Sequence, residues 1–393
     1  MSSKKKTATT ADGPPHRYPT RSKLRQPPHD HCYPRYLPIE VIFNILIFIP
    51  GNALFHVMRY VCKQWYDIIR DPDFVRLNSR MSTPGFLIQE TDCPHSDHNH
   101  VIHIDADTPT LNDATEIQIP SKTAVVSCFN GLVLLTNSSN RKIFHVANPM
   151  TKENISLPPL KGMSTAGIAV DSTGCYKVVC ASGASRSYNK QVKLRVFTIG
   201  IDKGWRSIDL QGIQHVNSEM RDAMSYCPQT LGGFIYWWTH YYHTTSRRYG
   251  FALDIETETI YQFSEPEDVV KTAFAFISMG TNLGFIASGR GCTWRVWKLT
   301  DVKSGEWTEL ASINVSTLCS RYDEVLDPYV NLLYQPVKLF GGRLWFYCDI
   351  KDGSALARYK FGSDNLMVFR IKRRLNYRIL LSHANTLISP KNL

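Results

Sequence analysis

A short phrase in which glycine precedes an apolar, strand-like run recurs along this chain after residue 84. It reads NGLVLL at 130–135, GGFIYW at 232–237, NLGFI at 282–286 and GGRLWF at 341–346. Successive copies lie roughly fifty residues apart, or about twice that distance where one copy is missing. A period of this length is typical of repeat architectures, in which each unit buries its faces against its neighbours. The large part of the chain therefore folds as an array of similar units.

The residues between these recurring motifs indicate β-structure throughout. Short aromatic and β-branched runs alternate with Gly, Asn, Asp and Pro, as strands joined by tight turns do. One unit lacks the glycine motif, and its strands are predicted at 167–171, 176–179, 194–198 and 204–208. Four strands in a fifty-residue unit predict a kelch-like β-propeller, and residues 86–120 together with a final strand at 377–381 supply a sixth blade that closes the ring. We favour six blades and leave seven open, with a β-sandwich as the alternative fold.

Residues 36–78 have a different, helical pattern. Pro38 suits a first helical turn, and Glu40 favours the positive end of the same helix. Pro50-Gly51 stops this helix, and Asn52 is placed to cap a second one. A third helix opens at 61–65 and is expected to end before Pro72. The pattern predicts a compact module of three helices in front of the β domain.

The first of these helices is apolar almost all the way round. From Ile39 to Ile49 only Glu40 and Asn44 are polar, and they share one stripe. A module this small cannot bury so many aliphatic side chains, so the surplus surface predicts a protein partner. The alternative is a helical hairpin buried against the β domain behind it.

The module resembles an F-box in motif order and spacing. The matching elements are Leu37-Pro38, Glu40-Val41-Ile42, Ile45-Leu46, Val61-Cys62-Lys63-Gln64-Trp65 and Asp71-Pro72-Asp73-Phe74. The resemblance implies docking on a Skp-family adaptor and, through it, on a cullin. The adaptor contacts implied by the match are Leu37, Pro38, Val41, Ile42, Ile45, Leu46, Val61, Cys62 and Trp65. Trp65 has a second open role, which is to hold the helices together.

The bulky residues Phe43 and Phe48 depart from the F-box pattern and offer an alternative contact with the rest of this chain.

The β domain resembles the F-box-associated domain of plant F-box proteins. The phrases that carry this resemblance are Ser127 to Leu132, Asn148 to Lys152, Leu157 to Pro159, Tyr176 to Val179 and Trp205 to Ser207. Towards the carboxyl end the match is looser. We therefore divide the chain into a disordered basic tail at 1–35, an F-box module at 36–80 and a propeller-like substrate-recognition domain at 84–393.

Charge and cysteine content narrow the cellular setting. The net charge is +11, and residues 1–35 hold eight Lys or Arg against two Asp, with few aliphatics. A second basic group follows residue 369, and neither group is interleaved with aromatics as a nucleic-acid stacking platform is. Most cysteines lie in apolar, strand-like segments, which indicates reduced thiols packed in the protein interior. Examples are Cys128, Cys180, Cys319 and Cys348. No apolar run is long enough for a membrane span, so we expect a protein of the nucleus, the cytoplasm or both.

One group of residues has the composition of a metal site. Cys93, His95, His98, His100 and His103 lie close together, but their spacing matches no familiar zinc motif, and a solvated loop is the alternative interpretation. The sequence has no phosphate-binding loop, no Gly-x-Ser-x-Gly elbow and no His-Glu-x-x-His. We therefore expect no cofactor, no metal and no catalytic residues.

Taken with the resemblance, these observations predict a substrate receptor of a Skp/cullin/F-box E3 ubiquitin ligase, which presents target proteins bound by the β domain. The target itself is not identified, and the segment from Trp237 to Tyr249 is a candidate target surface unless its aromatics fill blade cores. Two other classes stay open. One is a basic nucleic-acid-binding or scaffold propeller without a ligase role, and the other is an enzyme or sugar-binding propeller in which the helices only dimerise.

Overall fold

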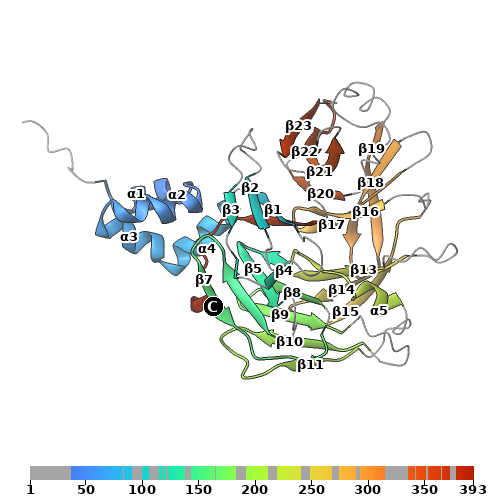
Figure 1. Ribbon diagram of the computed structural model, residues 1–393, viewed down its shortest axis with the longest axis horizontal. Coiled ribbons are helices and arrows are strands. Elements are labelled where there is room, and N and C mark those ends of the chain that lie inside the picture. Colours follow the sequence, from blue (N-terminus) through green and yellow to red (C-terminus); the bar gives the residue numbers. More distant parts are fainter. Residues whose placement is uncertain are drawn as a thin grey trace, which may run out of the picture.

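The computed structural model describes residues 37–82, 84–90, 100–105, 115–117, 119–120, 123–137, 143–163, 165–182, 192–210, 219–239, 248–267, 274–288, 293–314, 335–340, 342–350, 353–363, 365–371 and 378–393. A small helical module is followed by a six-bladed β-propeller (Figure 1). The proposed tail at 1–35 lies outside the described residues.

The helical module has four α-helices and a short 3-10 turn. They are α1 (Ile39–Leu46), α2 (Gly51–His56), η1 (Met58–Tyr60), α3 (Lys63–Arg70) and α4 (Pro72–Met81). The third helix ends before Pro72, as predicted, but the prediction of three helices was wrong. The Asp71 carboxylate accepts hydrogen bonds from the amides of Asp73 and Phe74 at 2.9 and 3.1 Å and so starts α4. Asn52 lies inside α2, which has Pro50 at its N-cap position, so the predicted cap was also wrong.

The first three blades contain strands β1 to β11, and blade 1 also takes in the last strand, β24. Blade 1 is β1 (Pro84–Glu90), β2 (His100–Asp105) and β3 (Thr115–Ile117), with β24 (Arg378–Ala384) beside β1. Blade 2 is β4 (Thr123–Phe129), β5 (Leu132–Asn137), β6 (Phe144–Asn148) and β7 (Glu153–Ser156). Blade 3 is β8 (Thr165–Val170), β9 (Tyr176–Ala181), β10 (Leu194–Thr198) and β11 (Arg206–Ile208).

Blades 4 to 6 complete the ring, and a short helix, α5 (Glu219–Ala223), precedes blade 4. Blade 4 is β12 (Gln229–Leu231), β13 (Phe234–Trp238), β14 (Tyr249–Asp254) and β15 (Ile260–Ser264). Blade 5 is β16 (Phe274–Met279), β17 (Asn282–Ser288), β18 (Thr293–Asp301) and β19 (Glu306–Asn314). Blade 6 is β20 (Gln335–Phe340), β21 (Arg343–Ile350), β22 (Gly353–Lys360) and β23 (Asn365–Ile371), and a brief parallel pairing of β16 with β20 joins it to blade 5.

The ring closes by pairing the two ends of the β domain. Strand β24 runs antiparallel to β1, so one blade combines three amino-terminal strands with the last strand of the chain. This confirms the predicted sixth blade. In this closure β1 is paired on both of its edges, with β24 on one side and β2 on the other.

Glycine turns start several of the strands, as the sequence indicated. Asn130 and Gly131 both have positive φ, and they form the two-residue hairpin between β4 and β5. Gly232 and Gly233 do the same between β12 and β13. Gly284, however, lies inside β17 against the side chain of Met279. The turn before β17 is made at Gly280 instead, with φ of 65°.

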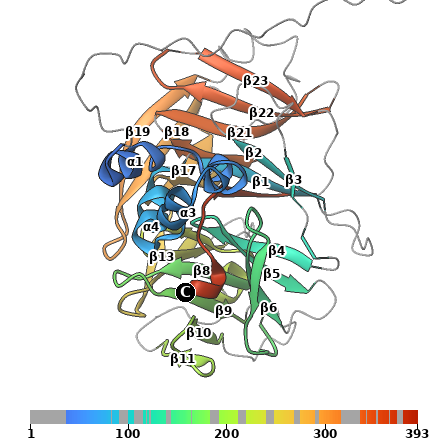
Figure 2. The same cartoon turned by 90° about the vertical axis from the view of Figure 1, so that its left-hand side faces the viewer.

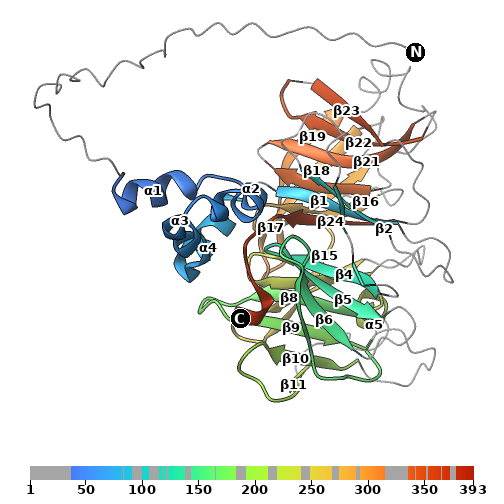
Figure 3. The same cartoon turned by 60° about the vertical axis from the view of Figure 1, so that its left-hand side comes forward.

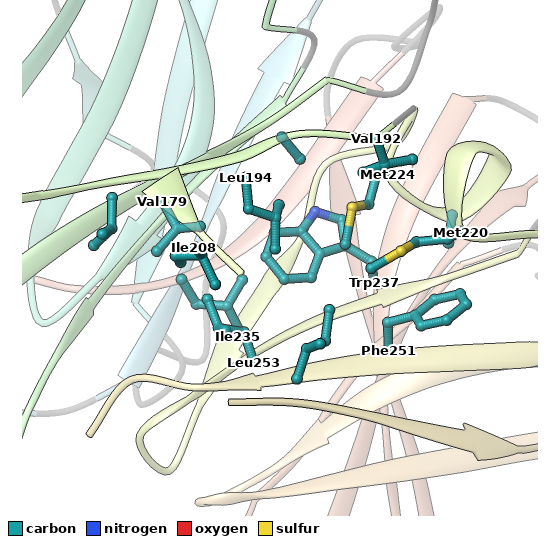
Figure 4. Close-up of a cluster of buried hydrophobic side chains, with 14 of the residues drawn as sticks. Val179, Val192, Leu194, Ile208, Met220, Met224, Ile235, Trp237, Phe251 and Leu253 are labelled. Carbon is teal, nitrogen blue, oxygen red and sulfur yellow. The ribbon is translucent and has the colours of Figure 1, made fainter. Parts of the chain in front are cut away.

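The propeller core consists of apolar clusters between neighbouring blades. Figure 4 shows the cluster between blades 3 and 4, where the indole of Trp237 is surrounded by Met220, Met224, Val192 and Phe251. Trp237 is 1% exposed, so the proposal that a target surface begins at this residue was wrong for Trp237. Residues 240–247 of that segment lie outside the described residues.

The structure describes the side chains of two of the four cysteines that lie in apolar segments. Cys180 is fully buried and Cys128 is half-buried, and both thiols are free. Burial raises the pKa of both thiols above the ordinary value of 9.0, which keeps them protonated and unreactive. Cys319 and the side chain of Cys348 lie outside the described residues.

Candidate partner-binding surface

The helical module stands on one face of the propeller. Figure 2 looks onto the module with the ring of blades behind it, and Figure 1 shows α1 and α3 on the side away from the ring. The module's own core is completed by two residues of the β domain, Met150 and Leu387. Met150 follows β6 in the turn to β7, so the module sits at the propeller face that carries this turn.

The buried side of the module is built around large apolar side chains. Leu46, Leu54 and Phe74 are fully buried, with Ile42, Ile68 and Ile69 beside them. The ring of Phe43 packs edge-on against Phe74, with ring centroids 5.2 Å apart. Asn78 on α4 donates two hydrogen bonds, to the carbonyl oxygens of Ile47 and Ile49 at 2.9 and 3.0 Å, which satisfies backbone acceptors after α1 ends.

The outer side of the module is unusually apolar for a solvent-facing surface. Sixteen large hydrophobic side chains in the described part of the chain are exposed, and eleven of them belong to the module. They are Leu37, Ile39, Val41, Ile45, Phe48, Val57, Tyr60, Val61, Tyr66, Leu77 and Met81. Exposed apolar side chains gathered in this way mark a surface for protein contact.

Two groups of these residues dominate. Val41, Ile45 and Phe48 are spaced at i, i+4 and i+7, so they line one stripe of α1 and of the turn that follows it. Tyr60 is the last residue of the 3-10 turn and Val61 follows it, and they are 67% and 57% exposed. We call these two groups together with Leu37 the apolar face of the module.

The residues singled out from sequence divide between this face and the core. Leu37, Pro38, Val41, Ile45, Val61 and Cys62 are exposed. Ile42 and Leu46 are buried inside the module, one residue along the helix from Val41 and Ile45. Trp65 is half-buried and packs against the module core, which is the second of the two roles left open for it.

Some exposed residues were absent from the sequence-based set. Phe48 is the most exposed of them, at 68%, so the alternative of a contact with the rest of the chain does not hold for Phe48, whereas Phe43 packs against Phe74. The signal for Phe48 was present in its spacing from Val41 and Ile45. Tyr60 has no such signal, because its exposure depends on the 3-10 turn between α2 and α3.

The grouped histidines give no metal site in the part of the chain that is described. Residues 91–99, and with them Cys93, His95 and His98, lie outside it. His103 is buried on β2 and faces His383. Within the described residues there is no group of three or more His, Cys, Asp or Glu side chains that could hold a metal ion. None of the helices described is both long enough and apolar enough to cross a membrane.

Comparison with protein families gives matches for both parts of the chain. Residues 36–77 match the F-box domain, and residues 86–330 match the F-box associated beta propeller domain. The second match alone spans more than half of the chain. The chain is an F-box protein. The helical module is thus the F-box, and the propeller is the F-box associated domain, although blade 6 and β24 lie beyond the matched residues.

Relatives of this F-box protein occur in Arabidopsis thaliana. One F-box protein of that plant is 23% identical over 308 residues, which cover 71% of this chain and 79% of the relative. A second is 28% identical over 201 residues, covering 44% of this chain and 45% of the relative. Among solved structures, TolB from Acinetobacter baumannii is 8% identical in sequence, with a TM-score of 0.44. The superposition covers 82% of this chain and 73% of the TolB chain.

Proposed function

We propose that this F-box protein is the substrate-receptor subunit of a Skp/cullin/F-box E3 ubiquitin ligase. The F-box binds a Skp-family adaptor, the adaptor joins it to a cullin, and the propeller holds the target protein. The observation that carries this proposal is the apolar face of the module, which is exposed although it belongs to a well-packed domain. The family match supports the same partner, because an F-box domain implies an adaptor of the Skp type.

The division between buried and exposed residues narrows the proposed contacts. Val41, Ile45 and Val61 are exposed and apolar, so an adaptor can bury them without unfolding the module. Ile42 and Leu46 already lie in the core, and we assign them a structural role. Phe48 and Tyr60 join the proposed contacts, since each is a large and strongly exposed ring of the module.

The proposed role needs no catalytic residue in this chain. A receptor that holds a target next to a charged conjugating enzyme raises the effective concentration of the reacting groups. We propose accordingly that the protein is not an enzyme, requires no cofactor, and acts in the nucleus, the cytoplasm or both. Its target is a protein, held by the propeller.

Co-purification of the full chain with a Skp adaptor tests the proposal. We expect Ile45→Glu to abolish binding, because the substitution places a charge between Val41 and Phe48 on the exposed apolar stripe of α1. Leu310→Glu is a matched control, since Leu310 on β19 is as exposed as Ile45, at 49%, but lies on the propeller. Circular dichroism checks that both variants fold. Failure of the unaltered chain to bind any Skp adaptor would remove the proposed function.

A further inference from the structure

The last nine residues, Asn385–Leu393, follow the ring-closing strand β24 and lie between the F-box and the propeller (Figure 3). We call them the carboxyl segment. It has no regular structure before the short turn η4 (Pro390–Asn392), yet Thr386, Leu387 and Ile388 are all buried. An irregular segment with such burial is held by its contacts with both neighbours.

Adjacent residues of the carboxyl segment face opposite partners. Leu387 packs into the F-box core with Leu46, Leu54 and Phe74. Ile388 packs instead into the cluster between blades 2 and 3. The segment thus contributes one apolar anchor to each of the two domains.

Polar contacts fix the propeller side of the carboxyl segment. The buried side-chain amide of Asn148 donates to the carbonyl oxygens of Thr386 and Ile388, both at 2.8 Å. The amide oxygen of Asn148 accepts from the backbone of Met150 and Thr151 at 2.9 and 3.3 Å. Every hydrogen-bonding group of this side chain is therefore engaged, and it ties the segment to the β6–β7 turn that also contacts the F-box.

Close backbone contacts complete the arrangement. The Thr386 hydroxyl donates to the carbonyl oxygen of Asn130 at 2.9 Å. At Gly51, the first residue of α2, a Cβ atom would lie 2.9 Å from the carbonyl oxygen of Asn385. A side chain at Gly51 would therefore collide with the segment, which means that α2 rests directly on it.

We propose that the carboxyl segment is the positioning element that fixes the F-box on the propeller, and that it makes the seating of the F-box depend on ring closure. The same short stretch completes the F-box core, binds the β6–β7 turn and continues the strand that closes the ring. In a receptor this element sets the angle between adaptor and target, a consequence that rests on the proposed function.

Hydrogen exchange on the full chain tests this, because amides of the module report how firmly it is seated. The Leu54 amide of α2 and the Lys152 amide of the β6–β7 turn are hydrogen-bonded and serve as reporters, and the hydrogen-bonded Thr239 amide in blade 4 serves as the reference. In Leu387→Ala and in Asn148→Ala we expect exchange at both reporters to rise about thirtyfold or more, with the Thr239 amide unchanged. Small-angle scattering should show a larger maximum dimension for both variants.

Leu157→Ala is the matched control. Leu157 is 4% exposed and lies in the same cluster as Ile388, but it does not belong to the F-box core. We expect this variant to leave the Leu54 amide as in the unaltered chain. Unchanged reporters in both test variants, or an equal rise in Leu157→Ala, would overturn the proposal. Adaptor binding is measured separately, so a chain that binds no adaptor leaves the exchange result standing.

Discussion

The imidazole rings of His383 and His103 meet edge-on inside blade 1, with ring centroids 5.4 Å apart. His383 lies on β24 and His103 on β2, and Gly85 on the intervening β1 leaves the space between them open. A Cβ atom at Gly85 would lie 2.7 Å from Nε2 of His103. The strand that closes the ring is therefore packed through two buried imidazoles.

This pair predicts a pH-dependent stability. Burial, with the charge of His103 as a smaller cause, lowers the pKa of His383 from 6.5 to about 3. In the unfolded chain His383 takes up its proton near pH 6.5, whereas in the folded chain it does so only near pH 3. We therefore expect the free energy of unfolding to fall as pH drops below 6.5, by up to about 1.4 kcal/mol per pH unit from this residue.

Urea denaturation at pH 7.5, 6.5 and 5.5 measures this dependence above the range in which carboxylates titrate. His383→Phe removes the titrating group and should flatten the curve over the same range. Parallel curves for the two proteins would show that His383 does not cause the slope.

Neighbouring residues on α1 predict opposite outcomes. Ile45→Glu should leave the thermal midpoint within a few degrees of the unaltered chain and abolish adaptor binding, because Ile45 is exposed. Leu46→Ala should cost about 2–5 kcal/mol of F-box stability, because it leaves a cavity beside Leu54 and Phe74. Thermal denaturation and adaptor titration on both variants check this. Equal stability losses would contradict the assignment of the two sides of α1.

A buried lysine joins blades 3 and 4. Lys177 Nζ donates to the carbonyl oxygen of Ile255 at 2.9 Å and lies 3.4 Å from Glu258 and 3.6 Å from Asp171. Arg206 also binds Glu258 with two hydrogen bonds, and these hold the pKa of the Glu258 carboxyl below 4.5.

We expect Lys177→Met to cost about 2–4 kcal/mol, because it leaves the carbonyl oxygen of Ile255 and the carboxylate of Asp171 without the lysine, whereas Glu258 keeps its bonds to Arg206. Lys193→Met is the control, since Lys193 is exposed directly before β10 of the same blade and should change stability by less than about 0.5 kcal/mol. Chemical denaturation measures both. A loss no larger in Lys177→Met than in the control would remove the role given to this lysine.

Substitutions of two turn glycines, Gly131 and Gly362, are predicted to lower the free energy of unfolding by different amounts. Gly131 has φ of 79°, and a side chain there would meet Thr386 of the carboxyl segment. Gly362 has a similar φ of 75°, but a Cβ atom there would have no other atom within 4 Å, so Gly362→Ala costs only backbone strain, about 1 kcal/mol. Gly131→Ala should cost at least twice as much. Denaturation midpoints that fall equally would mean that the contact with Thr386 is unimportant.

The fold could be predicted from sequence because its main signals are short local motifs and the regular spacing between them. The Asn130-Gly131 hairpin needs only two residues that tolerate positive φ, and the fifty-residue spacing indicated the repeat of blades. Gly284 misled, because a glycine within a strand and a glycine in a turn look alike in sequence. Helix α4 was missed because Asp71-Pro72 ends one helix and caps the next.

The binding surface was accessible only in part. Val41 and Ile45 face outward and Ile42 and Leu46 inward, but all four are aliphatic, so periodicity alone cannot say which stripe is buried. The hydrogen bonds from Asn148 to Thr386 and Ile388 join residues more than two hundred positions apart. No local pattern in the carboxyl segment indicates them.

The F-box rests on the propeller face that carries the β6–β7 turn, so the opposite ends of the strands are directed away from it. A strand of six residues such as β5 spans about 20 Å. In the proposed receptor the propeller is therefore also a spacer of fixed thickness. A target held on the far face would be separated from the adaptor by the full depth of the blades, and only a target with an extended or bulky body would reach back around the rim.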